Sequence, residues 1–123
     1  MSKTYGPYSA FRVAGSLVYT AGQIGAVKGR TKPEVKYQVK RALENLTSVL
    51  SEAGCGLHDV VKTTVFLTDM KHYADLNEVY AEVFDAAGTA PARTCVAVAE
   101  LPRVADYPLL VEIEAVALLR ESQ

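Results

Sequence analysis

The stretch LLVEIEAVALL, from Leu109 to Leu119, alternates two kinds of side chain and thereby decides the fold. Successive side chains of a β-strand point to opposite faces of a sheet, so the two faces can be considered separately. One face is wholly apolar and should meet helices, whereas the other mixes carboxylates with apolar groups. The apolar face consists of Val111, Ile113, Ala115 and Ala117, and the mixed face of Leu110, Glu112, Glu114, Val116 and Leu118.

Two amphipathic helices are predicted to cover the apolar face. Apolar residues recur at helical spacing in residues 27–56 and again in residues 68–88. Thr31 and Glu34 have the spacing of a capping box for the first helix, and Pro33 suits its first turn. The glycines expected to end the two helices, and the residues that could cap the second one, are Gly54, Gly88, Thr68 and Asp69.

Strands are predicted for the remaining segments. FRVAGSLVYTAGQI, residues 11–24, predicts two short strands around a turn at Gly15–Ser16. DVVKTTVFLT, residues 59–68, is short and rich in β-branched residues, as is typical of a strand. APARTCVAVAELP, residues 90–102, predicts a buried strand because it is almost free of charge.

The resulting order, β-β-α-β-α-β-β, predicts an α+β fold in a single domain spanning residues 1–123. Strands separated by one helix should pair in parallel, and both helices should cover one face of a mixed sheet. The last two strands are expected to form a hairpin with Leu101 opposite Leu109. That pairing would put Glu112 opposite Val98 and about 15 Å from Arg93.

Composition limits the classes of protein to consider. The 123 residues are 50% hydrophobic and 22% charged with a net charge of −1, so no overall field attracts nucleic acid or a membrane. No apolar run has membrane-spanning length, and the N-terminus lacks the apolar core of a signal peptide. Two cysteines, Cys55 and Cys95, without a CxxC motif favour a reducing cytoplasm.

The mixed face of the final strand is too apolar for a face that meets only water. We therefore expect an oligomer that packs sheet faces together, with Glu112 and Glu114 near its seams. The pattern alone does not separate a dimer from a trimer.

Arg93 opens an apolar strand, although a guanidinium is costly to bury without an anion. The anion could be a protein carboxylate, such as Glu112 or Glu114, or the carboxylate of a ligand. A structural ion pair is the commoner fate of a half-buried arginine. Arg93 lies at the mouth of a strand, and the pattern alone leaves both partners open.

Six stretches of the chain form a recognisable set in a fixed order, and Pro-Ala-Arg followed by Glu-Ile-Glu-Ala is its most specific part. The stretches are GPY at Gly6–Tyr8, TAGQI at Thr20–Ile24, DVVKTTVFLTDM at Asp59–Met70, LNEVYAEVF at Leu76–Phe84, PARTCVAVAELP at Pro91–Pro102 and VEIEAVAL at Val111–Leu118. Together they cover nearly the whole chain. The set resembles the Rid family of reactive-intermediate deaminases, also called the YjgF family.

The resemblance implies a chorismate-mutase-like α+β fold and a homotrimer whose sheets form a central barrel. It also implies active sites in the clefts between subunits, where 2-imino or enamine acids such as 2-aminoacrylate are hydrolysed to 2-keto acids and ammonia. An imine carbon is already electrophilic, so the expected reaction needs no metal, cofactor or covalent nucleophile.

Five residues match family positions with a role. Arg93 matches the arginine that grips the substrate carboxylate, and a planar guanidinium suits a bidentate grip. Glu112 matches the glutamate that activates or orients the attacking water, with the backbone carbonyl of Cys95 as a second acceptor. Tyr8 matches a pocket tyrosine, and Gly22 a close approach of the backbone to the ligand. Arg93 and Glu112 are predicted to meet across a subunit boundary.

Each role has a structural alternative. Glu112 and Glu114 could both be solvated residues of an exposed sheet face. The thiol of Cys95 is expected to pack as a small hydrophobe rather than to act as a nucleophile. Tyr8 could simply pack the N-terminus down. Asn77, in the apolar stripe of the second helix with Tyr73, Tyr80 and Phe84, could reach a cleft and bind substrate or could cap a nearby loop.

The chain also departs from the family pattern. Ala21 stands where many deaminating members carry serine, so one pocket hydroxyl is missing. The link RVADYPLL, residues 103–110, is longer than expected, and a shift of register there would exchange the roles of Glu112 and Glu114. The segment before Gly6 is short, so the N-terminal edge could be built differently.

Two other functions stay open. One is a non-catalytic trimer that binds small carboxylates such as 2-keto acids. The other is RNA binding or RNA cleavage, because residues 28–41 hold six basic residues and one acid, although Tyr37 is the only stacking aromatic there. His58 and His72 do not have the spacing of metal ligands.

Overall fold

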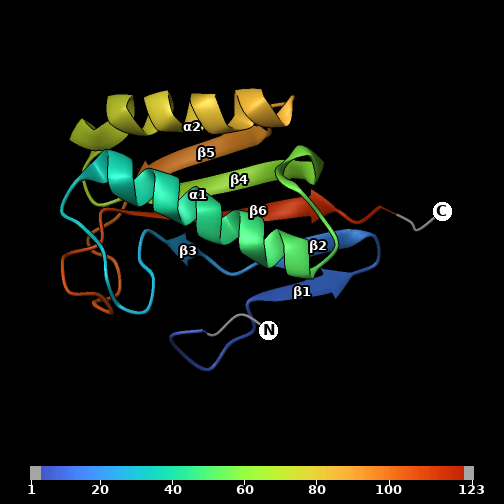
Figure 1. Cartoon of the computed structure of the whole chain (residues 1–123), viewed down its shortest axis with the longest axis horizontal. Helices are drawn as coiled ribbons and strands as arrows, with labels where there is room; N and C mark the ends of the chain where they lie inside the picture. The colour runs from blue at the N-terminus through green and yellow to red at the C-terminus, as the bar shows by residue number, and fades with distance from the viewer. Residues whose placement is uncertain (1–3, 121–123) are drawn as a thin grey trace.

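Six strands form one mixed sheet in the computed structural model, which describes residues 4–120. Figure 1 shows both helices on one side of this sheet, as the alternation in the last strand predicts. The elements are β1 (Phe11–Ala14), β2 (Leu17–Thr20), β3 (Gln23–Ile24), α1 (Val35–Glu52), β4 (Val60–Leu67), α2 (Tyr73–Ala87), β5 (Ala92–Ala97) and β6 (Val111–Leu118).

The strand order is β1-β2-β6-β4-β5, and the short β3 also pairs with β6. The predicted parallel pairing across a helix is confirmed for β4 and β5, which flank α2. The strands that flank α1, β3 and β4, are not neighbours, because β6 lies between them and is antiparallel to both. The predicted hairpin of the last two strands is wrong. The link between them is long enough to pass the end of β4, so β6 pairs with β4 instead of β5.

β6 carries the alternation predicted for it. Its even-numbered side chains, from Glu112 to Leu118, are half-buried or exposed, and its odd-numbered ones face the helices. The odd-numbered side chains pack with the apolar stripes of α1 and α2 to form the core. The largest fully buried residues of that core are Phe84, Leu43, Leu46, Leu50, Leu67, Leu76 and Ile113.

β5 is an edge strand, so the expectation of a buried strand at residues 90–102 is wrong for the single chain. Ala92, Thr94 and Val96 are exposed, and Arg93 and Cys95 are half-buried under α2. Low charge indicated burial on both faces, but the helices cover only one face and no described strand pairs with the outer edge. A strand with a free edge and an uncovered face is suited to contact another chain.

The observed helix ends agree only in part with those predicted from the sequence. Gly54 and Gly88 end the helices with left-handed backbone, at φ +85° and +99°. The capping box is wrong, because α1 begins only after Glu34, whose side chain caps nothing. The hydroxyl of Thr31 donates instead to the carbonyl of Gly25. Pro33 consequently lies before the first turn, and Asp69 caps the short turn that precedes α2, by accepting from the Lys71 N–H at 2.8 Å.

A buried glutamine fixes the link before β6. Gln38 of α1 is fully buried, and its amide donates to the carbonyls of Lys32 at 2.8 Å and Pro108 at 3.0 Å. Its carbonyl oxygen accepts from the Leu110 N–H at 2.8 Å. One side chain therefore ties the loop before α1 and the end of the link to the helix, two residues before Glu112.

We predict that Gln38→Leu lowers the free energy of unfolding by about 3 kcal/mol, because it leaves three part-buried backbone groups without the partner that Gln38 supplies. Urea denaturation at a fixed chain concentration measures the change. Lys40→Leu, at an exposed position of the same helix, is the control and should change stability by less than about 0.5 kcal/mol. Equal stability of the Gln38→Leu variant and the native chain would contradict this account.

Candidate active site

Arg93 lies at the second position of β5, and its side chain turns toward α2. Its guanidinium carbon lies 4.9 Å from the ring centre of Tyr80 and 5.5 Å from that of Tyr73. A guanidinium N–H also donates to the hydroxyl of Tyr73 at 3.1 Å. No carboxylate of the described residues lies within 4.0 Å of it. The structural ion pair is therefore not found in residues 4–120.

Tyr80 supports the guanidinium of Arg93 with its ring, and the ring itself is held in place. Its hydroxyl shares a 2.7 Å hydrogen bond with the buried Thr63, and its ring centre lies 4.6 Å from that of Phe84. Burial raises the pKa of Tyr80, against the opposing effects of the Thr63 hydrogen bond and the Arg93 charge. The ring system stays neutral, so it orients the guanidinium without neutralising it.

Cys95 and Asn77 lie on the same side as Arg93. Cys95 is two residues further along β5 and packs against the core, and burial raises the pKa of its thiol against the effect of the Arg93 charge. A neutral, half-buried thiol is a poor nucleophile. Asn77 shares the α2 face of Tyr73 and Tyr80 by helical spacing, and its side chain caps no loop among the described residues.

The other predicted site residues form a second group. Tyr8, Gly22 and Glu112 line one cavity of about 500 Å³, which Arg93 does not reach. A Cβ atom at Gly22 would collide with the carboxylate of Glu112, so the glycine leaves room for that carboxylate. The approach of its backbone to a ligand stays a prediction. Tyr8 is half-exposed, and its hydroxyl accepts from the Tyr5 N–H at 3.3 Å.

Glu112 is the half-buried carboxyl group of this cavity. Burial raises its pKa, and the negative charge of Glu114 raises it further. The two carboxyl groups lie on the same face of β6, about 7 Å apart by strand rise. Glu114 itself is exposed and does not line the cavity. A carboxyl group with a raised pKa exchanges protons more readily near neutral pH than an ordinary glutamate does.

The register of the sheet separates Arg93 from Glu112 within one chain. Arg93 pairs with Thr63, whereas Glu112 pairs with Phe66, three residues further along β4. This offset amounts to about 10 Å along the strands and about 10 Å across two strand spacings. The odd offset also places the two side chains on opposite faces of the sheet. One small substrate therefore cannot bridge both residues of one chain.

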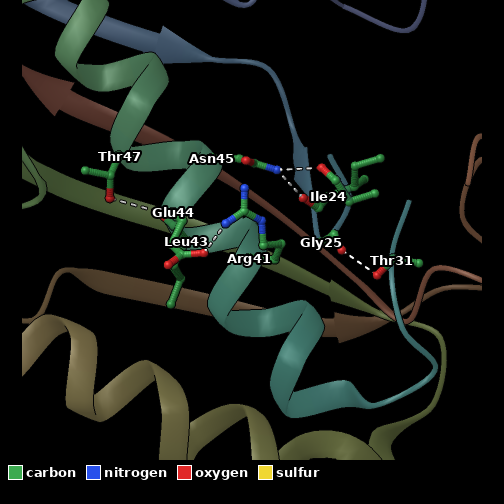
Figure 2. Close-up of polar contacts among 9 residues, drawn as sticks. Ile24, Gly25, Thr31, Arg41, Leu43, Glu44, Asn45 and Thr47 are labelled. Atoms are coloured by element: carbon green, nitrogen blue, oxygen red, sulfur yellow. Dashed lines mark hydrogen bonds and ion pairs between the residues drawn. The ribbon is translucent and has the colours of Figure 1, made fainter. Parts of the chain in front are cut away.

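Asn45 of α1 holds the cavity wall in place. Its amide donates at 2.9 Å to the carbonyls of both Ile24 and Ala26, as Figure 2 shows for the segment that follows β3. The same view shows the hydroxyl of Thr31 donating a hydrogen bond to the carbonyl of the neighbouring Gly25. These bonds tie residues 24–26 to the helix, so the wall next to Gly22 has a defined position.

The sequence interpretation missed the tyrosines that hold Arg93. Tyr73 and Tyr80 were expected only as part of the apolar stripe of α2, and Thr63 had no expected role. Their spacing of seven residues puts both rings on one helix face, which is the signal that could have revealed them. Their partner on β5 could not be chosen without knowing that α2 covers the start of that strand.

Comparison with known proteins identifies the family of this chain. A sequence profile for the family described as Endoribonuclease L-PSP matches residues 2–119. The chain belongs to this family, which is also called YjgF or Rid. A RutC family protein of Synechocystis is 48% identical over 93% of this chain and 87% of its own length. A 2-iminobutanoate/2-iminopropanoate deaminase of Salmonella typhimurium is 39% identical over 94% of this chain and 89% of its own.

A Rid structure is also similar in three dimensions. The crystal structure of Escherichia coli TdcF with bound serine superposes with a TM-score of 0.87 at 38% identity, covering 95% of this chain and 91% of that one. The resemblance predicted from the six sequence stretches is therefore confirmed.

Other candidate features of this Rid chain are weaker. Within residues 4–120, no three or more His, Cys, Asp or Glu side chains are grouped to hold a metal ion, and no helix is long and apolar enough to cross a bilayer. The exposed His58 lies 3.5 Å from a carboxylate oxygen of Asp59. In the basic segment 28–41, Lys36 pairs with Glu78 and Arg41 with Glu44.

We predict that Glu112 titrates above the ordinary range of a glutamate and that Glu114→Gln lowers its pKa, because the substitution removes a neighbouring negative charge. Burial, the larger cause, should keep the pKa raised in the variant. Carboxyl-carbon NMR titration measures both values. The exposed Glu78→Gln, on α2, is the control and should leave the Glu112 titration unchanged. A pKa of Glu112 at or below the ordinary range would contradict the burial described here.

Proposed function

We propose that this chain hydrolyses 2-imino and enamine acids, such as 2-aminoacrylate, to 2-keto acids and ammonia. The observation that carries the proposal is the guanidinium of Arg93, which lies on two tyrosine rings with no carboxylate of the described chain beside it. A cation oriented in this way is prepared to bind the carboxylate of a small acid bidentately. The deaminase named among the relatives acts on acids of this class.

Glu112 acts on the water. An enamine first tautomerises to the imine, and water then adds to C2 while the π electrons of the C=N bond move to nitrogen. Glu112 accepts a proton from the water as the C–O bond forms, and the carbonyl oxygen of Cys95 accepts its other hydrogen bond. The nitrogen takes up a proton from solvent as it receives these electrons, which gives a neutral carbinolamine. Glu112 then returns its proton to this nitrogen, the C2–N bond breaks and ammonia leaves, while the C=O bond forms and the hydroxyl proton passes to solvent. A carboxyl group with a raised pKa suits both transfers.

The active site is shared between subunits of a homotrimer. Because Arg93 and Glu112 of one chain lie on opposite faces of the sheet, a complete site requires Arg93 and Cys95 of one subunit beside Glu112, Gly22 and Tyr8 of the next. Asn77 flanks the arginine and contacts the substrate. Two features support assembly: the free edge of β5, and apolar side chains on the uncovered sheet face, where Tyr19, Val96 and Leu118 are 45%, 40% and 45% exposed.

Two alternatives have some support. The name of the matching family favours RNA cleavage, and exposed lysines in residues 28–41 could bind phosphates, although two of the six basic residues there are paired. The serine bound by the TdcF relative suits a protein that binds small acids without converting them.

Both cysteines are free thiols, as expected if the protein works in the cytoplasm.

The trimer is testable by mass. Light scattering in dilute buffer should give three times the 13.3 kDa of one chain, because packing of the uncovered faces removes apolar surface from water. Leu118→Lys on that face should lower the mass, whereas Ala86→Lys, at an exposed position of α2, is the control and should keep the mass of the native protein. A stable native monomer would remove the shared site.

Activity is testable with freshly generated imines. An amino-acid dehydratase supplies 2-aminoacrylate, and the chain should speed release of ammonia. Arg93→Lys should lose about as much activity as Arg93→Ala, at least a hundredfold, because a point charge cannot replace a bidentate grip. Cys95→Ala should keep most of the activity, since only the backbone carbonyl acts. A Cys95→Ala trimer without activity would instead support a thiol nucleophile, and RNA cleavage without imine hydrolysis would support the family name.

Mixing experiments test whether the site is shared. Arg93→Ala and Glu112→Gln should each be inactive alone, but mixed trimers should recover part of the activity because some clefts receive both native residues. Glu114→Gln is the matched control and should change turnover little. A mixture that stays inactive after verified subunit exchange would contradict the shared cleft. An inactive Glu114→Gln variant would instead assign the activation of the water to Glu114.

A further inference from the structure

The cavity beside Glu112 is larger than the proposed reaction needs. Its volume is about 500 Å³, and its walls come from four separate segments of the described chain: residues 4–10, residues 22–28, α1 and the link before β6. A cavity of this size suits ligands of drug-like dimensions, of roughly 300 Å³ or more of pocket space. An imino acid of three or four carbons would leave most of it to water.

The walls of the cavity are mainly apolar. Tyr8, Ile24, Val49 and Val104 line it, and Ile24 and Val49 are buried residues with fixed positions. Asn45 also lines it, but its amide hydrogens are already used by the two carbonyls shown in Figure 2. Beyond Glu112, the charged group on the described walls is Lys28, which lies on an exposed loop. Such walls favour an apolar occupant over a polar one.

The link contributes directly to this cavity. Pro102 and Val104, from the segment that joins β5 to β6, form part of the wall. Val104 also packs on the small apolar cluster of Ile24, Ala26 and Leu109. The segment that is longer than the Rid resemblance predicts therefore shapes the space next to the candidate catalytic carboxyl group.

We propose that this cavity holds the side chain of the substrate, so that the preferred substrates are 2-imino acids with large apolar or aromatic side chains. The inference rests on the proposed function. With the carboxylate on Arg93 of the next subunit and the attacking water on Glu112, C2 lies at the mouth of the cavity. The substituent on C2 then enters the space between Tyr8 and Val49, where burial of its apolar surface favours binding.

The test compares imines that differ only in the side chain. L-Amino-acid oxidase, with catalase to remove peroxide, supplies imines from leucine, phenylalanine and alanine. The value of kcat/KM for the leucine and phenylalanine imines should exceed that for the alanine imine at least tenfold. A preference for the alanine imine would overturn this inference and leave the proposed function intact. Failure to hydrolyse any of the three would overturn the proposed function itself.

A pair of neighbouring variants tests the cavity itself. Ser48 lines it from an exposed position of α1, and Ser48→Trp should fill it and lower the leucine-to-alanine ratio of kcat/KM at least tenfold. Thr47 is also exposed on α1 but does not line the cavity, and its hydroxyl donates to the Leu43 carbonyl. Thr47→Trp is therefore the matched control and should keep the native ratio. An unchanged ratio in Ser48→Trp would show that the side chain binds elsewhere.

Discussion

The alternation of the β6 side chains between the two faces of the sheet is the constraint on which the rest of this structure depends. β6 is central in the sheet, so its odd-numbered side chains must fill the space under both helices while its even-numbered ones face away. A shift of one residue would bury Glu112 and Glu114 in the core and expose Ile113. The amide of Gln38 opposes that shift, because it binds the backbone of Leu110 directly before the strand. The same register then places Glu112 over Gly22, where no side chain competes for the space.

The sheet that positions Glu112 also keeps it away from Arg93. Each residue is held by its own surroundings: the arginine by the rings of α2, the carboxyl group by the backbone at Gly22. Within one chain neither group is neutralised by the other, so the guanidinium stays without a carboxylate partner and the pKa of Glu112 stays raised. A direct ion pair would lower that pKa and occupy the guanidinium. The separation within one chain thus preserves the chemistry that the proposed shared site requires.

The sequence predicted those features that depend on local periodicity. The stripes of the two helices, the turn at Gly15–Ser16 and the two faces of β6 all follow from spacing alone, and the glycines at both helix ends follow from their backbone freedom. The pairing of the strands was harder to predict, because the place of β6 between β4 and β2 depends on contacts between residues distant in sequence. The capping box at Thr31 failed for a similar reason: its hydroxyl found the carbonyl of Gly25, and its N–H found Asp106 in the link, 75 residues away.

The candidate site likewise divides into residues that sequence motifs identify and surroundings that only the fold reveals. Arg93 and Glu112 were identified from motifs, but their surroundings required the fold: Tyr80 reaches Arg93 from α2, and Val104 reaches the cavity from the link. Val104 lies in a loop, and loops tolerate change that a packed strand does not. Under the proposed function, reaction type and substrate size therefore depend on different parts of the chain. The register of β6 sets where the proposed water is activated, whereas residues 22–28, α1 and the link set how much room lies beside Glu112.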